Sequence, residues 1–110
     1  MKEQDYQRKI VDYLATQDTY TVKVITASKK GVPDIVGCLP ITKEMAMKHF
    51  ETYDTLGVFM AVEVKTPRTI NNTSKLQDYN LAKINEAGGI AIVAWSVDAV
   101  SEVLEAIYDN

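Results

Sequence analysis

The chain has 110 residues, of which 46% are hydrophobic and 25% are charged, and its formal net charge is −3. This balance fits one compact globular domain and argues against intrinsic disorder. A single cysteine and a single histidine exclude an internal disulfide framework and argue against a zinc site. The longest apolar runs are too short to cross a bilayer, and the charged start MKEQDYQRKI has no apolar signal core, so we expect a cytoplasmic protein.

The first half of the chain predicts two helices with two strands between them. Apolar residues recur at helical spacing in residues 2–16, which predicts an amphipathic helix with these on its apolar face: Tyr6, Ile10, Tyr13 and Leu14. The β-branched stretch YTVKVITA (20–27) and the segment DIVGCL (34–39) are typical of strands. Residues 43–53 predict a helix with Thr42 as its N-cap.

The second half predicts two further strands and two further helices. VFMAVEVK (58–65) is typical of a strand, and residues 75–87 predict a helix that ends at the glycine pair 88–89. The unbroken apolarity of IAIVAW (90–95) predicts a buried strand, with Trp95 in the core. Asp98 is expected to cap a last, acidic helix whose inward face is Val100, Val103, Leu104 and Ile107.

This order of elements predicts an α/β sandwich built around a mixed central sheet, in a single domain over residues 1–110. Residues 41–57 are a helical insertion between the second and third strands. Core packing is the simpler interpretation of the large apolar residues there, and a partner interface is the alternative; they are Met45, Met47, Phe50 and Tyr53.

Three charged residues form the most informative pattern. Glu63 and Lys65 lie two residues apart on an apolar strand, so they project from the same face. Taken alone they fit a solvated strand end, but Asp34 also stands where a buried strand begins, and an unpaired buried carboxylate is costly. Two acids at strand ends are suited to Mg²⁺, and Lys65 is suited to orient water or stabilise negative charge. The set predicts metal-assisted phosphodiester hydrolysis.

The strings GVPDIVGC (31–38) and VFMAVEVK (58–65) carry the PD…ExK pattern of the PD-(D/E)xK nuclease superfamily. The chain most resembles its small VRR-NUC nucleases of phages and bacteria, which are related to Holliday-junction resolvases. The resemblance extends over nearly the whole chain and implies a restriction-endonuclease-like fold and a DNA endonuclease that requires Mg²⁺ or Mn²⁺. It also implies metal ligation by Asp34, Glu63 and the Val64 backbone carbonyl.

The resemblance implies two further site residues. The family carries a glutamate on its first helix, which Glu3 matches, although an acid there also favours the helix dipole. The family's glutamine on the helix after ExK matches Gln77. Thr73 and Ser74 are both candidate N-caps of that helix, and with Ser74 the glutamine completes a capping box. The sequence leaves both roles of Gln77 open.

The resemblance also implies a DNA partner, most naturally a branched or four-way junction in a bacterial or phage-infected cell. Basic residues expected to contact phosphates are Lys29, Lys30, Arg68 and Lys75, although an ordinary solvated loop explains the first two equally well. A homodimer would suit a symmetric junction. The alternatives are a non-catalytic DNA-binding or assembly module that retains the fold and, less specifically, an α/β regulatory domain.

Overall fold

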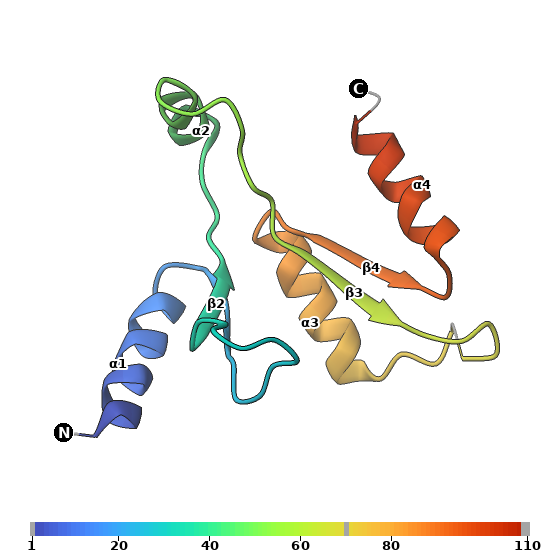
Figure 1. The fold of residues 1–110 in the computed structure, drawn as a ribbon, viewed down its shortest axis with the longest axis horizontal. Coiled ribbons are helices and arrows are strands. Elements are labelled where there is room, and N and C mark those ends of the chain that lie inside the picture. The colour runs from blue at the N-terminus through green and yellow to red at the C-terminus, as the bar shows by residue number, and fades with distance from the viewer. Residues whose placement is uncertain (1, 70, 109–110) are drawn as a thin grey trace. The chain divides into compact units, whose positions relative to one another are not determined.

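The computed structural model describes residues 2–69 and 71–108 and divides the chain into two compact units, residues 1–59 and 60–110 (Figure 1). Each unit has its own helices and its own two-stranded sheet. The helices and strands that the sequence predicts are all present, and the α/β class is confirmed.

The first unit contains α1 (Glu3–Ala15), β1 (Tyr20–Lys23), β2 (Ile35–Cys38) and α2 (Lys43–Phe50). β1 and β2 pair in antiparallel fashion, and α1 packs against β1. Cys38 is buried, as a small hydrophobic residue in a strand is expected to be.

The buried face of α1 differs from the predicted one. Residues Gln7, Val11 and Leu14 are half-buried, at the i, i+4, i+7 spacing of one helical stripe. The other apolar residues on which the prediction depended are largely exposed: Tyr6, Ile10 and Tyr13. The prediction was wrong because the apolar residues of α1 spread over more than one stripe, and only the stripe through Leu14 is covered.

The helix α2 begins as the sequence predicts, since the Thr42 hydroxyl accepts a hydrogen bond from the Met45 backbone N–H at 3.2 Å. Its large apolar side chains are exposed rather than packed in a core: Met45, Met47, Phe50 and, just beyond the helix, Tyr53. Met45 and Met47 stand about 200° apart around a helix, so one neighbouring element cannot bury both. His49 hydrogen-bonds the Thr55 carbonyl at 2.7 Å and stacks on Tyr53, which is a local structural role.

Gly37 of β2 faces Thr21 of β1 where the two backbones are close. A Cβ atom added at Gly37 would lie 2.8 Å from the Tyr20 carbonyl oxygen. We therefore expect Gly37→Ala to lower the free energy of unfolding by about 2 kcal/mol, because the strands must separate to make room. Chemical denaturation measures this change, with Gly57→Ala as the control because a Cβ there meets no atom within 4 Å. Equal losses in both variants would contradict the prediction.

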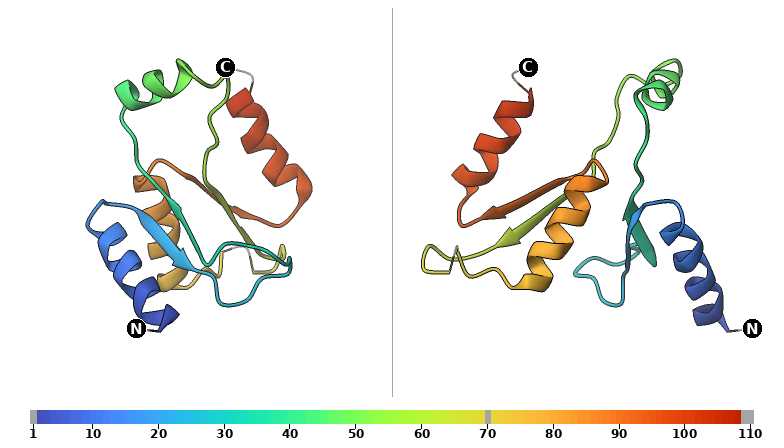
Figure 2. Two further views of the ribbon diagram at one scale, coloured as in Figure 1. Left: turned by 60° about the vertical axis from the view of Figure 1, so that its left-hand side comes forward. Right: turned by 180° about the vertical axis from the view of Figure 1, so that it is seen from behind.

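The second unit contains β3 (Met60–Val64), α3 (Lys75–Glu86), β4 (Ile90–Ala94) and α4 (Val97–Tyr108). β3 and β4 are parallel and α3 forms the crossover between them, as a parallel pair requires. Within this unit α3 lies on one face of the two strands and α4 on the other (Figures 1 and 2).

Strand pairing among the described residues lies within each unit. Antiparallel and parallel pairing are both present, but they form two separate sheets, β1–β2 and β3–β4. Each ladder joins strands that follow each other within one unit, whereas residues 39–59, which include the predicted insertion 41–57 and α2, separate β2 from β3 along the chain.

Hydrogen bonds at both ends of α3 match the sequence. Ser74 is the N-cap, and at the other end the Gly88 and Gly89 N–H groups donate to the Asn85 and Ile84 carbonyls at 3.0 and 2.9 Å. Gly88 has a φ of +89°, the left-handed conformation that this helix termination requires and that glycine adopts without strain.

Two predictions near the end of the chain are wrong. Ser96, not Asp98, accepts the hydrogen bond from the Ala99 backbone N–H, at 3.1 Å, so Asp98 lies inside the first turn of α4. An acid there still favours the positive end of the helix dipole. Trp95 is 51% exposed rather than in the core, because β4 ends at Ala94 and the indole lies beyond the ladder.

Candidate active site

Glu63 on β3 and Lys65, the residue directly after β3, project on the same side, as their spacing predicts, and the side chain of Gln77 on α3 joins them there. The Lys65 Nζ lies 3.4 Å from Glu63 Oε1 and donates to Gln77 Oε1 at 3.2 Å. The Gln77 Nε2 donates to the same Glu63 oxygen at 2.6 Å. The three side chains therefore form one closed group of contacts, which we call the Glu63–Lys65–Gln77 cluster.

Gln77 is a helix cap, one of the two roles that the sequence left open, and it also contacts the charged pair, while its role as a nuclease site residue stays a prediction. The Ser74 hydroxyl accepts from the Gln77 backbone N–H at 3.1 Å, and the Ser74 backbone N–H donates to Gln77 Oε1 at 3.0 Å, which completes a capping box. The same side-chain amide contacts Glu63 and Lys65. A helix cap and a contact to the charged pair are therefore made by one side chain.

The cluster is only partly open to solvent. The side chain of Lys65 is 16% exposed and that of Glu63 is 32% exposed, while Gln77 is half-buried. Charged hydrogen bonds in such a place are stronger than on an open surface, and they order the side chains that make them. The lysine is thus positioned by two partners before any ligand is present.

The carboxylate of Glu63 fits a hard divalent cation. Its Oε1 contacts Gln77 and Lys65, whereas its Oε2 has no hydrogen-bond partner among the described residues. Carboxylate oxygens are the ligands that Mg²⁺ and Mn²⁺ take in proteins. Val64 ends β3, and its side chain lies on the opposite face from Glu63. Within residues 2–69 and 71–108, no three His, Cys, Asp or Glu side chains form a group that could hold a metal.

Asp34 and Glu3 belong to the first unit. Asp34 directly precedes β2, and its backbone carbonyl accepts from the Val24 N–H at 2.8 Å, so the strand pairing fixes its backbone while its side chain is exposed. Glu3 is the first residue of α1 and is also exposed. The structure brings Glu63, Lys65 and Gln77 together, and it places Asp34 and Glu3 only within their own unit.

The basic residues predicted to contact DNA are all exposed. Lys29 and Lys30 lie in the loop between β1 and β2, and Lys75 is the first residue of α3. Arg68 lies in a turn directly after Lys65, closed by a bond from the Thr69 backbone N–H to the Thr66 carbonyl at 2.9 Å. Sequence reasoning missed this turn, although Pro67 at its second position is a usual turn signal.

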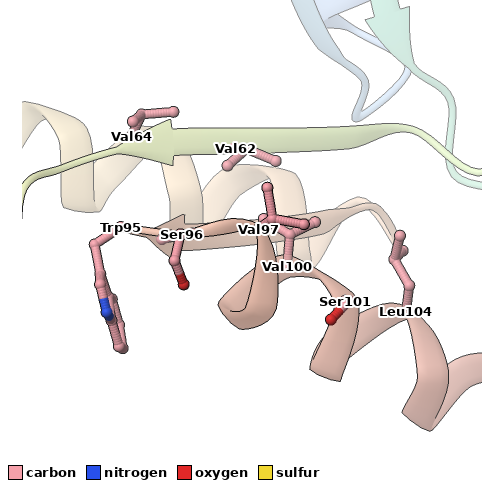
Figure 3. A pocket seen from close by; sticks show the side chains of 9 residues that line it. Val62, Val64, Trp95, Ser96, Val97, Val100, Ser101 and Leu104 are labelled. Carbon is pink, nitrogen blue, oxygen red and sulfur yellow. The ribbon is translucent and has the colours of Figure 1, made fainter.

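An apolar pocket of about 500 Å³ lies on the other face of the β3–β4 sheet, against α4 (Figure 3). Its lining comes from β3, β4 and the first turns of α4: Val62, Val64, Ala94, Trp95, Ser96, Val97, Val100, Ser101 and Leu104. None of these side chains belongs to the Glu63–Lys65–Gln77 cluster. The Glu63–Lys65–Gln77 cluster and this apolar pocket are therefore on opposite faces of one sheet.

The family model for the VRR-NUC domain matches residues 1–98. This is most of the chain, so the protein belongs to the VRR-NUC family, and the family is one of nucleases. No curated protein and no solved structure shows significant similarity to this chain. The matched region contains every member of the cluster and ends near the start of α4. None of the helices that the structure describes has both the length and the apolarity needed to cross a membrane.

Proposed function

We propose that the protein is a Mg²⁺- or Mn²⁺-dependent DNA endonuclease of the PD-(D/E)xK type. The single observation that carries the proposal is the Glu63–Lys65–Gln77 cluster, in which a carboxylate and an ammonium group are held together at the end of one strand of a nuclease-family chain. A bound divalent cation would supply a more acidic water and neutralise charge on the scissile phosphate.

The chain's own residues have separate roles in this reaction. Glu63 and the Val64 carbonyl hold the cation, and Lys65 orients the attacking water or stabilises the negative charge that develops on the phosphate. We assign Asp34 as a second acidic ligand and Glu3 as an assisting acid, on the resemblance of GVPD and of the first helix to the family pattern. Lys29, Lys30, Arg68 and Lys75 contact DNA phosphates, since all four are exposed.

The proposed substrate is branched DNA, with a four-way junction as the leading candidate, and the proposed active form is a homodimer. A symmetric junction needs two cuts related by two-fold symmetry, which a dimer with two identical sites supplies. An acidic chain of net charge −3 also gains a longer track of basic residues when two copies act together. A strict monomer that makes paired, symmetric cuts would contradict this part of the proposal.

The decisive experiment is cleavage of an end-labelled four-way junction and a linear duplex of matched sequence, with Mg²⁺, with Mn²⁺, with Ca²⁺ and with a chelator. We expect cleavage of the junction with Mg²⁺ or Mn²⁺, slower cleavage of the duplex, and none after chelation, because the carboxylates alone cannot activate water for attack on a phosphodiester. Adding Mg²⁺ after chelation should restore the rate. Tight metal-independent binding with no cleavage of any substrate would instead support a DNA-binding or assembly module.

A further inference from the structure

The orientation of the Gln77 side chain follows from its three partners. Its Oε1 accepts two hydrogen bonds, from the Ser74 backbone N–H at 3.0 Å and from the Lys65 ammonium at 3.2 Å. Neither donor can accept a hydrogen bond, so the oxygen end of the amide must face them. The Nε2 end then points at Glu63, whose carboxylate accepts from it at 2.6 Å.

We infer that the capping box of α3 positions the nuclease site, and that the backbone N–H of Ser74 is the group that does so. By fixing the oxygen end of the Gln77 amide, it presents a donor to Glu63 Oε1 and leaves Oε2 for the divalent cation. Ser74 is a positioning residue, because it acts through Gln77. The inference rests on the proposed metal-dependent cleavage and adds to it the group that sets how Glu63 meets the cation.

The physical reason is that the side-chain amide can rotate and exchange its oxygen and nitrogen ends. The Glu63 carboxylate can accept a hydrogen bond only from the nitrogen end of that amide. Without the Ser74 N–H, only Lys65 favours the present orientation. If the Gln77 amide turns over, its Oε1 faces Glu63 Oε1 and two acceptors oppose each other. Glu63 then loses its shortest contact, and its second oxygen is no longer held in one direction. Loss of such an outer contact lowers metal affinity or activity about 10–100-fold in metal enzymes.

Ser74 contributes its hydroxyl and its backbone N–H, and different substitutions can remove the hydroxyl alone or both groups. Its hydroxyl accepts from the Gln77 backbone N–H and so starts the helix, whereas its own backbone N–H holds the Gln77 side chain. Ser74→Ala removes only the hydroxyl. Ser74→Pro removes the hydroxyl and the N–H, and the φ of −75° at this residue lies within the range of proline. Ser74→Thr keeps both groups and is the conservative rescue.

The test uses the full chain and measures three quantities for each variant: the thermal unfolding midpoint, the Mn²⁺ affinity of the DNA-free protein by calorimetry, and kcat and KM on the four-way junction. We expect Ser74→Ala and Ser74→Pro to lose similar thermal stability. Mn²⁺ affinity and kcat should fall about 10-fold further in Ser74→Pro than in Ser74→Ala, with KM for DNA little changed. Ser74→Thr should have wild-type values of all three quantities.

Two further variants keep the inference testable if Ser74→Pro does not fold. Gln77→Glu retains an acceptor for the Ser74 N–H, as glutamate does in many capping boxes, but it cannot donate to Glu63. It should therefore remain folded and lose kcat about 10-fold or more. Thr42→Ala removes the matching cap of α2, in the first unit, and should leave kcat unchanged.

The outcomes separate the inference from the function on which it rests. Equal Mn²⁺ affinity and equal kcat in Ser74→Ala and Ser74→Pro, with a cleaving wild type, would overturn the positioning role and leave the nuclease proposal intact. Wild-type kcat in a folded Gln77→Glu variant would overturn it in the same way. A wild type that binds no Mn²⁺ and cuts no DNA would overturn the proposed function itself.

Discussion

Replacement of Lys65 by methionine is expected to lower the rate of DNA cleavage by about 100- to 1,000-fold while the protein stays folded. The ammonium group lies 3.4 Å from the Glu63 carboxylate and is 16% exposed, so it is both placed at the cluster and partly shielded from water. Removing one preorganised group that stabilises negative charge in a transition state has a cost of this size. Single-turnover cleavage of a four-way junction at saturating Mg²⁺ measures the effect.

Lys65→Met should change the affinity for Mn²⁺ far less than the rate of DNA cleavage. Glu63 keeps its hydrogen bond from Gln77, so the Mn²⁺ affinity of Lys65→Met is expected to stay within a few-fold of the wild type. Lys83→Met is the matched control, because Lys83 also lies in the second unit but pairs with Glu86 and makes no contact with the cluster. A Lys65→Met protein that cuts DNA as fast as Lys83→Met would exclude Lys65 from the reaction.

The local features of the second unit could be predicted from sequence because each depends on residues close together in the chain. The shared face of Glu63 and Lys65 follows from the two-residue period of a strand. The Ser74 cap and the termination at Gly88 follow from rules that act within one helical turn. The double role of Gln77 needed the structure, because a sequence does not show whether the capping side chain also reaches across to β3.

The sequence predicted poorly which side chains of the helices and strands are buried in the folded chain. Tyr6 and Ile10 have the right spacing for an apolar stripe, yet the neighbouring stripe through Val11 is the one that α1 half-buries. Trp95 is apolar and follows a buried strand, but the ladder ends one residue before it. Spacing identifies candidate faces, and packing between distant segments selects among them.

Loss of either proposed acidic ligand is expected to slow metal-dependent cleavage strongly. Asp34→Asn and Glu63→Gln each replace an anionic oxygen with an amide of nearly the same size, so the fold should be retained while affinity for a hard cation falls. We expect each variant to cut the junction at least about 100-fold more slowly than the wild type, since even outer contacts of a metal site contribute 10–100-fold. Mn²⁺ calorimetry and single-turnover cleavage test both effects.

The pair of variants also tests whether the first unit contributes to the reaction, because Asp34 belongs to it and Glu63 to the second unit. Asp12→Asn is the control for Asp34, as it removes an exposed acid from α1 in the same unit and should leave both measurements unchanged. Matching losses in Asp34→Asn and Glu63→Gln are expected if both acids hold the same cation. If Glu63→Gln is inactive while Asp34→Asn cuts at the wild-type rate, Asp34 is not a ligand, and the acids that complete the site must be sought elsewhere in the chain or in a second copy.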